Sequence, residues 1–105
     1  MTQEFTHQSA ADALSRSVGL IEQGRPQDAA ATVALVSCWL KSCLRLNDHT
    51  DTSAIICLNA DIDVRLGIAD LQDSEYALAG ESLQRAIKWL RFGPAIESET
   101  NAGAW

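Results

Sequence analysis

The chain has 105 residues, of which 47% are hydrophobic, and its 14 acidic and 8 basic residues give a net charge of −6 at neutral pH. This length supports one domain with a single modest core, and the composition is that of a globular protein rather than a disordered one. The acidic balance, without any basic stripe, argues against direct binding of nucleic acid.

The first predicted helix follows a short N-terminal arm, residues 1–8, which we expect to be flexible. Ser9 is a suitable N-cap because Asp12 follows three residues later. Gly24 comes where glycine commonly ends a helix. We therefore predict a helix over residues 9–23. Its apolar residues recur at spacings of three and four: Ala11, Leu14, Val18 and Ile21.

The second predicted helix begins near Pro26, since proline is favourable in the first turn, and continues without a breaker to Asn47. One apolar stripe consists of Val33, Val36, Leu40 and Leu44. A second, adjacent stripe consists of Leu35, Trp39 and Leu46. Apolar residues thus cover about half of the circumference, which is wider than the stripe of an ordinary surface helix. We expect this helix to be central or to face a second chain.

Residues 54–71 fit two patterns. Every second residue from position 56 to 68 is apolar, as in a strand. A helical stripe is also present, and it consists of Ile55, Leu58, Ile62, Leu66 and Ala69. Asn59, Asp63 and Asp70 lie opposite this stripe. A strand of this length is unusual and no hairpin turn divides it, so we predict a helix.

The last predicted helix begins at Asp73 or Ser74 and ends near Phe92, before Gly93 and Pro94. Its core stripe consists of Tyr76, Ala79, Leu83, Ala86, Ile87 and Leu90. Residues 94–105 are predicted to form a flexible acidic tail. The whole pattern predicts an all-α bundle of three to four helices over residues 9–93, which we expect to be dimeric.

The cysteines are the most reactive side chains in the sequence. On a helix, Cys38 and Cys43 lie about 140° apart, which does not suit a shared metal ion. Neither His7 nor His49 lies in a ligand pattern with them, and their apolar flanks do not favour a nucleophilic thiolate. We therefore predict that Cys38, Cys43 and Cys57 are structural and buried or half-buried. No cofactor, metal site or catalytic residue is predicted, so we do not expect an enzyme.

Two further motifs are weak. "NADIDVRLGIAD" places oxygen ligands at several calcium-loop positions, but Val64 stands where the loop requires glycine. A solvated acidic face that would attract a basic partner is the better interpretation. "LIEQGRPQDAAATV" looks like the hairpin of a tetratricopeptide unit, yet no second copy follows 34 residues later, at Asp63. An ordinary helical hairpin is favoured over a repeat array.

Apolar residues in excess of the core stripes indicate a protein interface. Tryptophans beside such surfaces often anchor interfaces, although they can equally fill a small core. The predicted docking residues are Trp89, Leu78, Trp39, Phe92 and Leu35. We also predict a homodimer formed through the second or the last helix.

The N-terminus lacks the regions of a signal peptide, and no apolar run approaches the roughly 20 residues of a membrane helix. We therefore expect no membrane association. Three cysteines cannot all pair within one chain, so we expect the protein to be in a reducing cytoplasm.

Two segments, "ADALSRSVGLIEQGRPQDAAATVALVSCWLKSCL" and "AGESLQRAIKWL", resemble the small helical accessory regulators of bacteria. In size and character the chain is similar to quorum-sensing anti-activators of the LasR-binding type. The resemblance implies a non-enzymatic regulator that covers the dimerisation or DNA-binding surface of a LuxR-type transcription activator. It assigns no functional residues. The alternative is a bundle that binds a small apolar ligand or serves as an enzyme-accessory subunit, and a closed pocket lined by Cys38, Leu58 and Leu83 would favour it.

Overall fold

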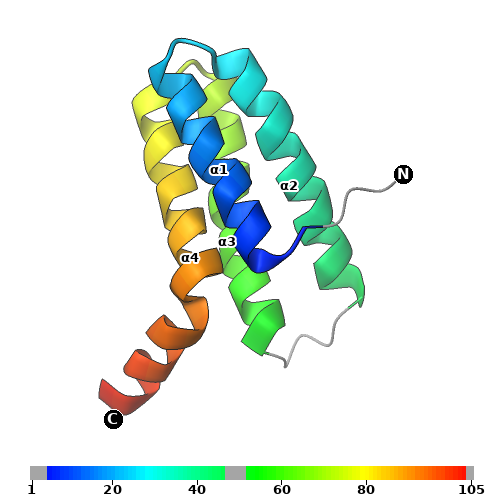
Figure 1. Cartoon of the computed structure of the whole chain (residues 1–105), viewed down its shortest axis with the longest axis vertical. Coiled ribbons are helices and arrows are strands. Elements are labelled where there is room, and N and C mark those ends of the chain that lie inside the picture. The colour runs from blue at the N-terminus through cyan, green and yellow to red at the C-terminus, as the bar shows by residue number, and fades with distance from the viewer. Residues whose placement is uncertain (1–4, 47–51, 104–105) are drawn as a thin grey trace.

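The computed structural model describes residues 5–46 and 52–103, with side chains over residues 5–44 and 55–92. Every regular element in these residues is an α-helix, which confirms the predicted all-α class. The four helices are α1 (His7–Glu22), α2 (Pro26–Leu46), α3 (Thr52–Gln72) and α4 (Tyr76–Gly103) (Figure 1).

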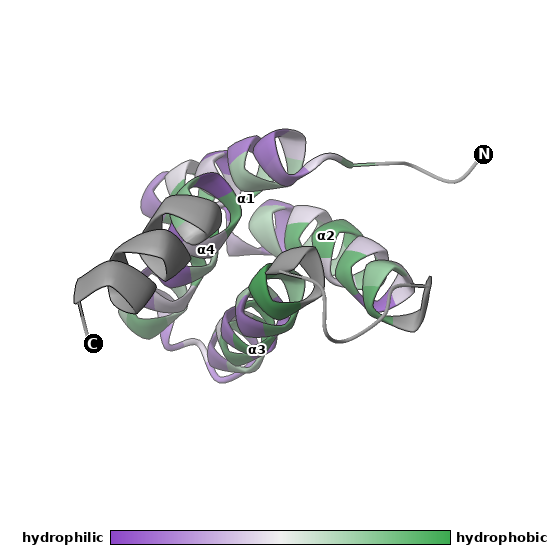
Figure 2. Ribbon diagram, turned by 90° about the horizontal axis from the view of Figure 1, so that it is seen from below, coloured by the Kyte–Doolittle hydropathy of each residue, from purple (hydrophilic) through white to green (hydrophobic). Residues whose placement is uncertain are grey.

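The helices form an up-and-down bundle. Each helix packs against the one that follows it in the chain, and α4 closes the ring by packing against α1. Seen along the bundle, α1 lies opposite α3 and α2 lies opposite α4 (Figure 2). Residues from α2 and α4 therefore face different sides of the molecule.

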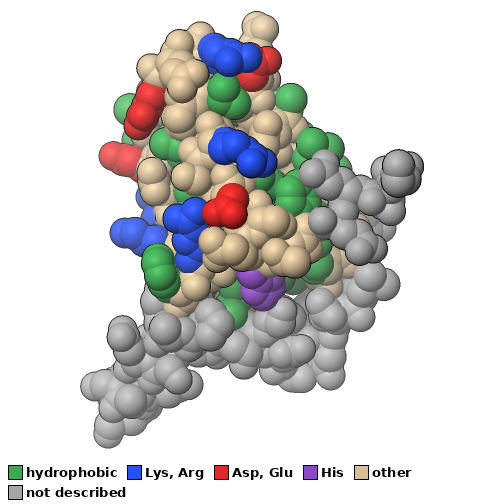
Figure 3. All heavy atoms as spheres, viewed as in Figure 1, with side chains coloured by type: hydrophobic (Ala, Val, Ile, Leu, Met, Phe, Trp, Pro, Cys, Tyr) green, Lys and Arg blue, Asp and Glu red, His purple; other side chains and the backbone are tan. Residues whose placement is uncertain are grey.

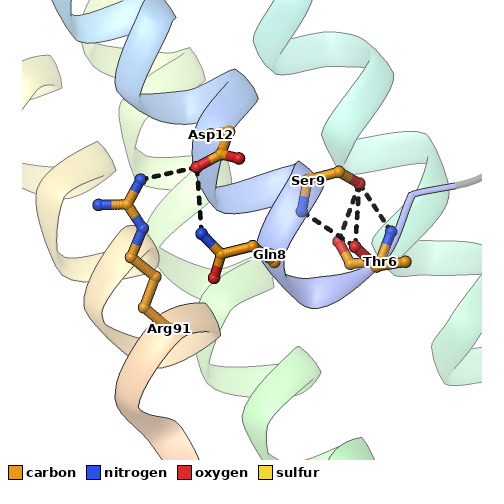
Figure 4. Close-up of polar contacts among 5 residues, drawn as sticks. All are labelled: Thr6, Gln8, Ser9, Asp12 and Arg91. Atoms are coloured by element: carbon orange, nitrogen blue, oxygen red, sulfur yellow. Dashed lines mark hydrogen bonds and ion pairs between the residues drawn. The ribbon is translucent and has the colours of Figure 1, made fainter.

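The start of α1 differs by two residues from the prediction. Thr6, not Ser9, is the N-cap, and its Oγ1 accepts a hydrogen bond from the Ser9 amide at 3.0 Å (Figure 4). The Ser9 hydroxyl oxygen in turn accepts from the Thr6 amide at 2.8 Å. This reciprocal capping box satisfies two amides that would otherwise lack partners. One turn later, Asp12 pairs with Arg91 at 2.8 Å and ties α1 to α4.

Most of the predicted core stripes face the interior. The stripes of α1 and α4, and the first stripe of α2, are buried or half-buried, with one exception. Tyr76, predicted to be in the core of α4, is 42% exposed. The fully or nearly fully buried side chains include Leu14, Val33, Val36, Leu40, Val64 and Leu83.

The buried face of α3 is not its apolar stripe. The helix itself was predicted, but Ile55, Leu58, Ile62 and Leu66 are exposed. The buried side is the opposite one, formed by Ile56, Cys57, Ala60, Val64 and Gly67. Gly67 in particular lets α3 approach α4 closely, because a methyl group there would lie 2.9 Å from the Leu83 side chain.

The end of α4 also corrects the prediction. Instead of stopping near Phe92, the helix continues through Gly93 and Pro94 to Gly103. Proline removes one backbone hydrogen bond and bends a helix, and α4 changes direction where it leaves the bundle (Figure 1). The predicted flexibility of residues 94–105 stays a prediction, and Trp105 lies outside the described residues.

The two hairpins, α1–α2 and α3–α4, are copies of one unit offset by 50 residues. Both connections have the same backbone hydrogen bonds: the Gly24 amide donates to Ile21 and the Ser74 amide to Leu71, at 3.1 and 3.2 Å. Buried and half-buried residues also recur at this offset, and the identical pairs include Ala29 with Ala79, Trp39 with Trp89 and Leu40 with Leu90. This correspondence at 50 residues is distinct from the 34-residue repeat of a tetratricopeptide array, which the sequence does not support.

Candidate functional site

The five predicted docking residues do not share one surface. Leu35 and Trp39 are on α2, whereas Leu78, Trp89 and Phe92 are on α4, which lies across the bundle. Leu35, Leu78 and Phe92 are 50%, 49% and 55% exposed. Single exposed apolar residues are common on proteins, so these three do not by themselves define a site.

Both tryptophans are half-buried and pack against the core. The Trp39 ring meets Phe5 edge-on, with ring centroids 5.9 Å apart, and His7 in the same manner at 6.1 Å. Trp39 therefore closes the end of the bundle where α1 begins. Trp89 occupies the equivalent position, 50 residues later, in the second hairpin. This placement favours the alternative in which the tryptophans fill the core.

Four of the eight large apolar side chains that are exposed in the described part of the chain lie on α3. Ile55, Leu58, Ile62 and Leu66, here called the outer row, are 37%, 47%, 51% and 47% exposed. Their spacings of three, four and four residues place them along one side of the helix, opposite the buried face. The outer row runs for about three turns, which is enough to contact another helix.

The equivalent side of α1 has a different character. The residues 50 positions before the outer row are Phe5, Gln8, Asp12 and Arg16, and the last three are polar and exposed. Figure 3 views the molecule from the α1 side and shows acidic and basic side chains distributed over it. Because both helices occupy equivalent places in the bundle, the apolar character of the outer row is not required by the fold.

Two carboxylates border Ile62 in sequence, and each has its own arginine. Asp61 pairs with Arg65 at 2.9 Å, and Asp63 on the other side pairs with Arg85 of α4 at 3.2 Å. The Asp61 side chain is only 3% exposed, and its Oδ1 has no hydrogen-bond partner among the described residues. Burial raises the pKa of Asp61, while the positive charges of Arg65 and Lys41 oppose that shift.

The cysteines occupy three different environments. Cys57 is buried, Cys43 is half-buried and Cys38 is exposed, so the prediction of burial is wrong for Cys38. Cys38 lies on the outward side of α2, which neither neighbouring helix covers. Burial raises the pKa of the Cys43 thiol, and a hydrogen bond with Cys57 partly offsets this effect.

The structure also brings His7 to the second hairpin, with its Nε2 3.6 Å from the Cys57 sulfur. This contact could not be predicted from local spacing, because the two residues are 50 positions apart. Among the described side chains, no three His, Cys, Asp or Glu residues come together in a way that could hold a metal ion.

Two open grooves lie in equivalent places between the hairpins. A groove of about 640 Å³ between α1 and α4 is lined partly by Val18, Ile21 and Tyr76. A groove of about 470 Å³ between α2 and α3 is lined partly by Ile68 and Leu71, the equivalents of Val18 and Ile21, and by Pro26, the equivalent of Tyr76. Neither groove is lined by Cys38, Leu58 or Leu83, the residues expected around an internal ligand.

Comparisons with known proteins give no match to a protein-family model, a curated protein or a solved structure. In the part of the chain that the structure describes, no helix has the length and apolar character needed to span a membrane.

Proposed function

We propose that the protein is a non-enzymatic module that binds another protein through the outer row of α3. One observation supports this proposal above the others. The outer row is apolar and exposed, although the equivalent side of α1 shows that this bundle is compatible with Gln8, Asp12 and Arg16 there.

The energy available at the outer row is sufficient for recognition. Complete burial of one Leu or Ile side chain contributes about 1.5–3 kcal/mol. The four residues are roughly half exposed, so covering them would contribute on the order of 3–5 kcal/mol before the entropy losses of association are subtracted. Such a contact suits a regulatory interaction that forms and dissociates.

The shape of the outer row indicates the chemistry of its partner. A row with four-residue spacing is a ridge that packs into the groove of another helix. The net charge of −6 favours a partner with basic residues beside its apolar ones, because opposite charges accelerate association. The narrower prediction, a LuxR-type activator inhibited in the cytoplasm, is supported by the sequence resemblance alone.

The test compares equivalent positions in the two hairpins. Proteins captured from the native host are identified, and their dissociation constants are measured for the wild type, Leu66→Glu and Arg16→Glu. Positions 66 and 16 are equivalent, so both changes introduce glutamate at an exposed site on the same kind of helix. We expect Leu66→Glu to weaken binding tenfold or more and Arg16→Glu to change it less than twofold.

Circular dichroism checks that each variant is folded. A folded Leu66→Glu protein with wild-type affinity would contradict the proposal. Trp89→Ala is included as a comparison, because a loss of affinity confined to that variant would favour the docking surface predicted on α4.

A further inference from the structure

The outer row together with the exposed Ala69 is nearly symmetric about Ile62. Leu58 and Leu66 lie four residues before and after Ile62, and Ile55 and Ala69 lie seven residues before and after it. Reversing the direction of α3 about Ile62 therefore superimposes an apolar residue on each of these positions. A pattern of this kind is complementary to a second copy of itself in the antiparallel direction.

The charges around Ile62 are compatible with that arrangement. In an antiparallel pair of α3 helices, Asp61 and Asp63 of both copies lie level with the central Ile62, at the borders of the contact, although their side chains are only 3% and 13% exposed. Two unpaired acidic residues from each copy would repel there. Asp61 and Asp63 are instead neutralised within their own chain, by Arg65 and Arg85. The polar border of the row therefore places no uncompensated acidic pair at the centre.

We propose that the outer row of α3 pairs with the outer row of a second copy, antiparallel and two-fold symmetric about Ile62. This inference rests on the proposed function, since it names an occupant of the same docking surface. In this arrangement the interface of the expected homodimer lies on α3, and not on the second or the last helix. It also implies that a second copy and a different partner protein compete for one surface.

The strength of this self-association should be modest. A stable protein interface commonly buries about 1,200 Å² or more, and the outer row alone is a small single-helix contact. We therefore expect a dimer that dissociates on dilution, rather than an obligate one. Raising the concentration of the protein would then hide the outer row from other partners.

Disulfide cross-linking tests both the surface and the direction of pairing. Single cysteines are introduced as Ile62→Cys, Leu58→Cys or Leu66→Cys in a Cys38→Ser background, which lacks the exposed native thiol. In the antiparallel pair, position 62 faces itself, whereas position 58 faces position 66 of the other copy. The two copies of residue 58 are then roughly 12 Å apart along the helix axis. This separation exceeds the Cα–Cα distance of roughly 7 Å that a disulfide can span.

With copper-phenanthroline as the oxidant, we expect Ile62→Cys to form a disulfide-linked dimer and Leu58→Cys or Leu66→Cys alone to remain largely monomeric. An equimolar mixture of the last two variants should cross-link. Cross-linking of all three single variants by themselves would indicate parallel pairing and overturn the inference. No cross-linking above the Cys38→Ser background would overturn it as well.

Sedimentation separates this inference from the proposed function. The wild type should approach twice its 11.4 kDa mass as its concentration rises, while Ile62→Asp should remain a monomer. A wild type that stays monomeric, together with an Ile62→Asp variant that loses its host partner, would reject self-pairing and leave the proposed function intact. A wild-type dimer whose Ile62→Asp variant still binds the host partner would reject the proposed function and support self-pairing.

Discussion

Gly24 and Ser74 occupy the same position in the two hairpins and share a backbone conformation that L-residues rarely adopt, with φ of 77° and 60°. Each ends the first helix of its hairpin, and each amide donates to a carbonyl three residues earlier. Glycine adopts this left-handed conformation without a steric penalty, whereas serine is strained in it. The second hairpin thus keeps the turn of the first with a less suitable residue.

Exchanging these two residues should change stability in opposite directions. Ser74→Gly should raise the free energy of unfolding by about 0.5 kcal/mol, because relief of the strain exceeds the added entropy of the unfolded chain. Gly24→Ser should lower it by about 1 kcal/mol, although nothing lies within 4 Å of the added Cβ. Urea denaturation of both variants measures these changes. Effects of the same sign would show that the turns are not energetically equivalent.

Two glycines in the α3–α4 hairpin should respond differently to alanine. At Gly67 the added methyl group would lie 2.9 Å from Leu83, which is fully buried and cannot move freely. At Gly80 nothing lies within 4 Å of the added group. Thermal unfolding should therefore show Gly67→Ala destabilised by about 1–2 kcal/mol, from overpacking. Gly80→Ala should be stabilised by about 0.5–1 kcal/mol, from helix propensity. A stabilised Gly67→Ala protein would mean that α3 and α4 are less closely packed.

The thiols should react in the order of their exposure. Cys38 is exposed, Cys43 is half-buried with a raised pKa, and Cys57 is buried. Iodoacetamide alkylation followed by mass spectrometry should label Cys38 first and Cys57 last, because thiolate character and access set the rate. Brief urea unfolding, which removes the protection, provides the control and should equalise the three rates. Early labelling of Cys57 in the native protein would contradict its place in the core.

Much of the fold could be predicted from residue spacing, because four helices and most core residues follow from apolar periodicity and from breakers such as Gly24. Which face of α3 is buried could not be predicted in this way. This helix has apolar residues on two sides, and periodicity identifies a stripe without showing what covers it. Close packing against α4 selected the side with Ala60, Val64 and Gly67, so the larger Leu58 and Ile62 remained outside.

The candidate site was missed for the same reason. Excess apolar surface was predicted around Trp89 and Leu35, whereas the stripe of α3 was not predicted to be exposed. A comparison of the chain with itself at an offset of 50 residues could have found the outer row. It aligns Leu58 with Gln8, Ile62 with Asp12 and Leu66 with Arg16.

Asp61 provides a prediction about pH. The position equivalent to Asp61 in α1 is Ala11, which is fully buried, so Asp61→Ala copies a side chain that the unit already accommodates. A buried carboxylate oxygen without a partner costs about 1–3 kcal/mol, whereas an i,i+4 pair with an arginine that is 60% exposed contributes about 0.3–0.5 kcal/mol. Asp61→Ala should therefore raise the free energy of unfolding at pH 7 by about 1 kcal/mol.

The gain from Asp61→Ala should decrease as the pH falls. Because burial raises the pKa of Asp61 above its ordinary value of 3.8, the native state binds a proton at this site more readily than the unfolded state does. The wild type therefore recovers stability relative to the variant as the pH falls from 7 through the raised pKa towards 3.8. Urea denaturation across this range measures the difference, with Asp12→Ala, which removes an exposed carboxylate, as the control. If Asp61→Ala is destabilised at pH 7, or its gain grows on acidification, the carboxylate has a stabilising partner and the charged form is the one that the bundle favours.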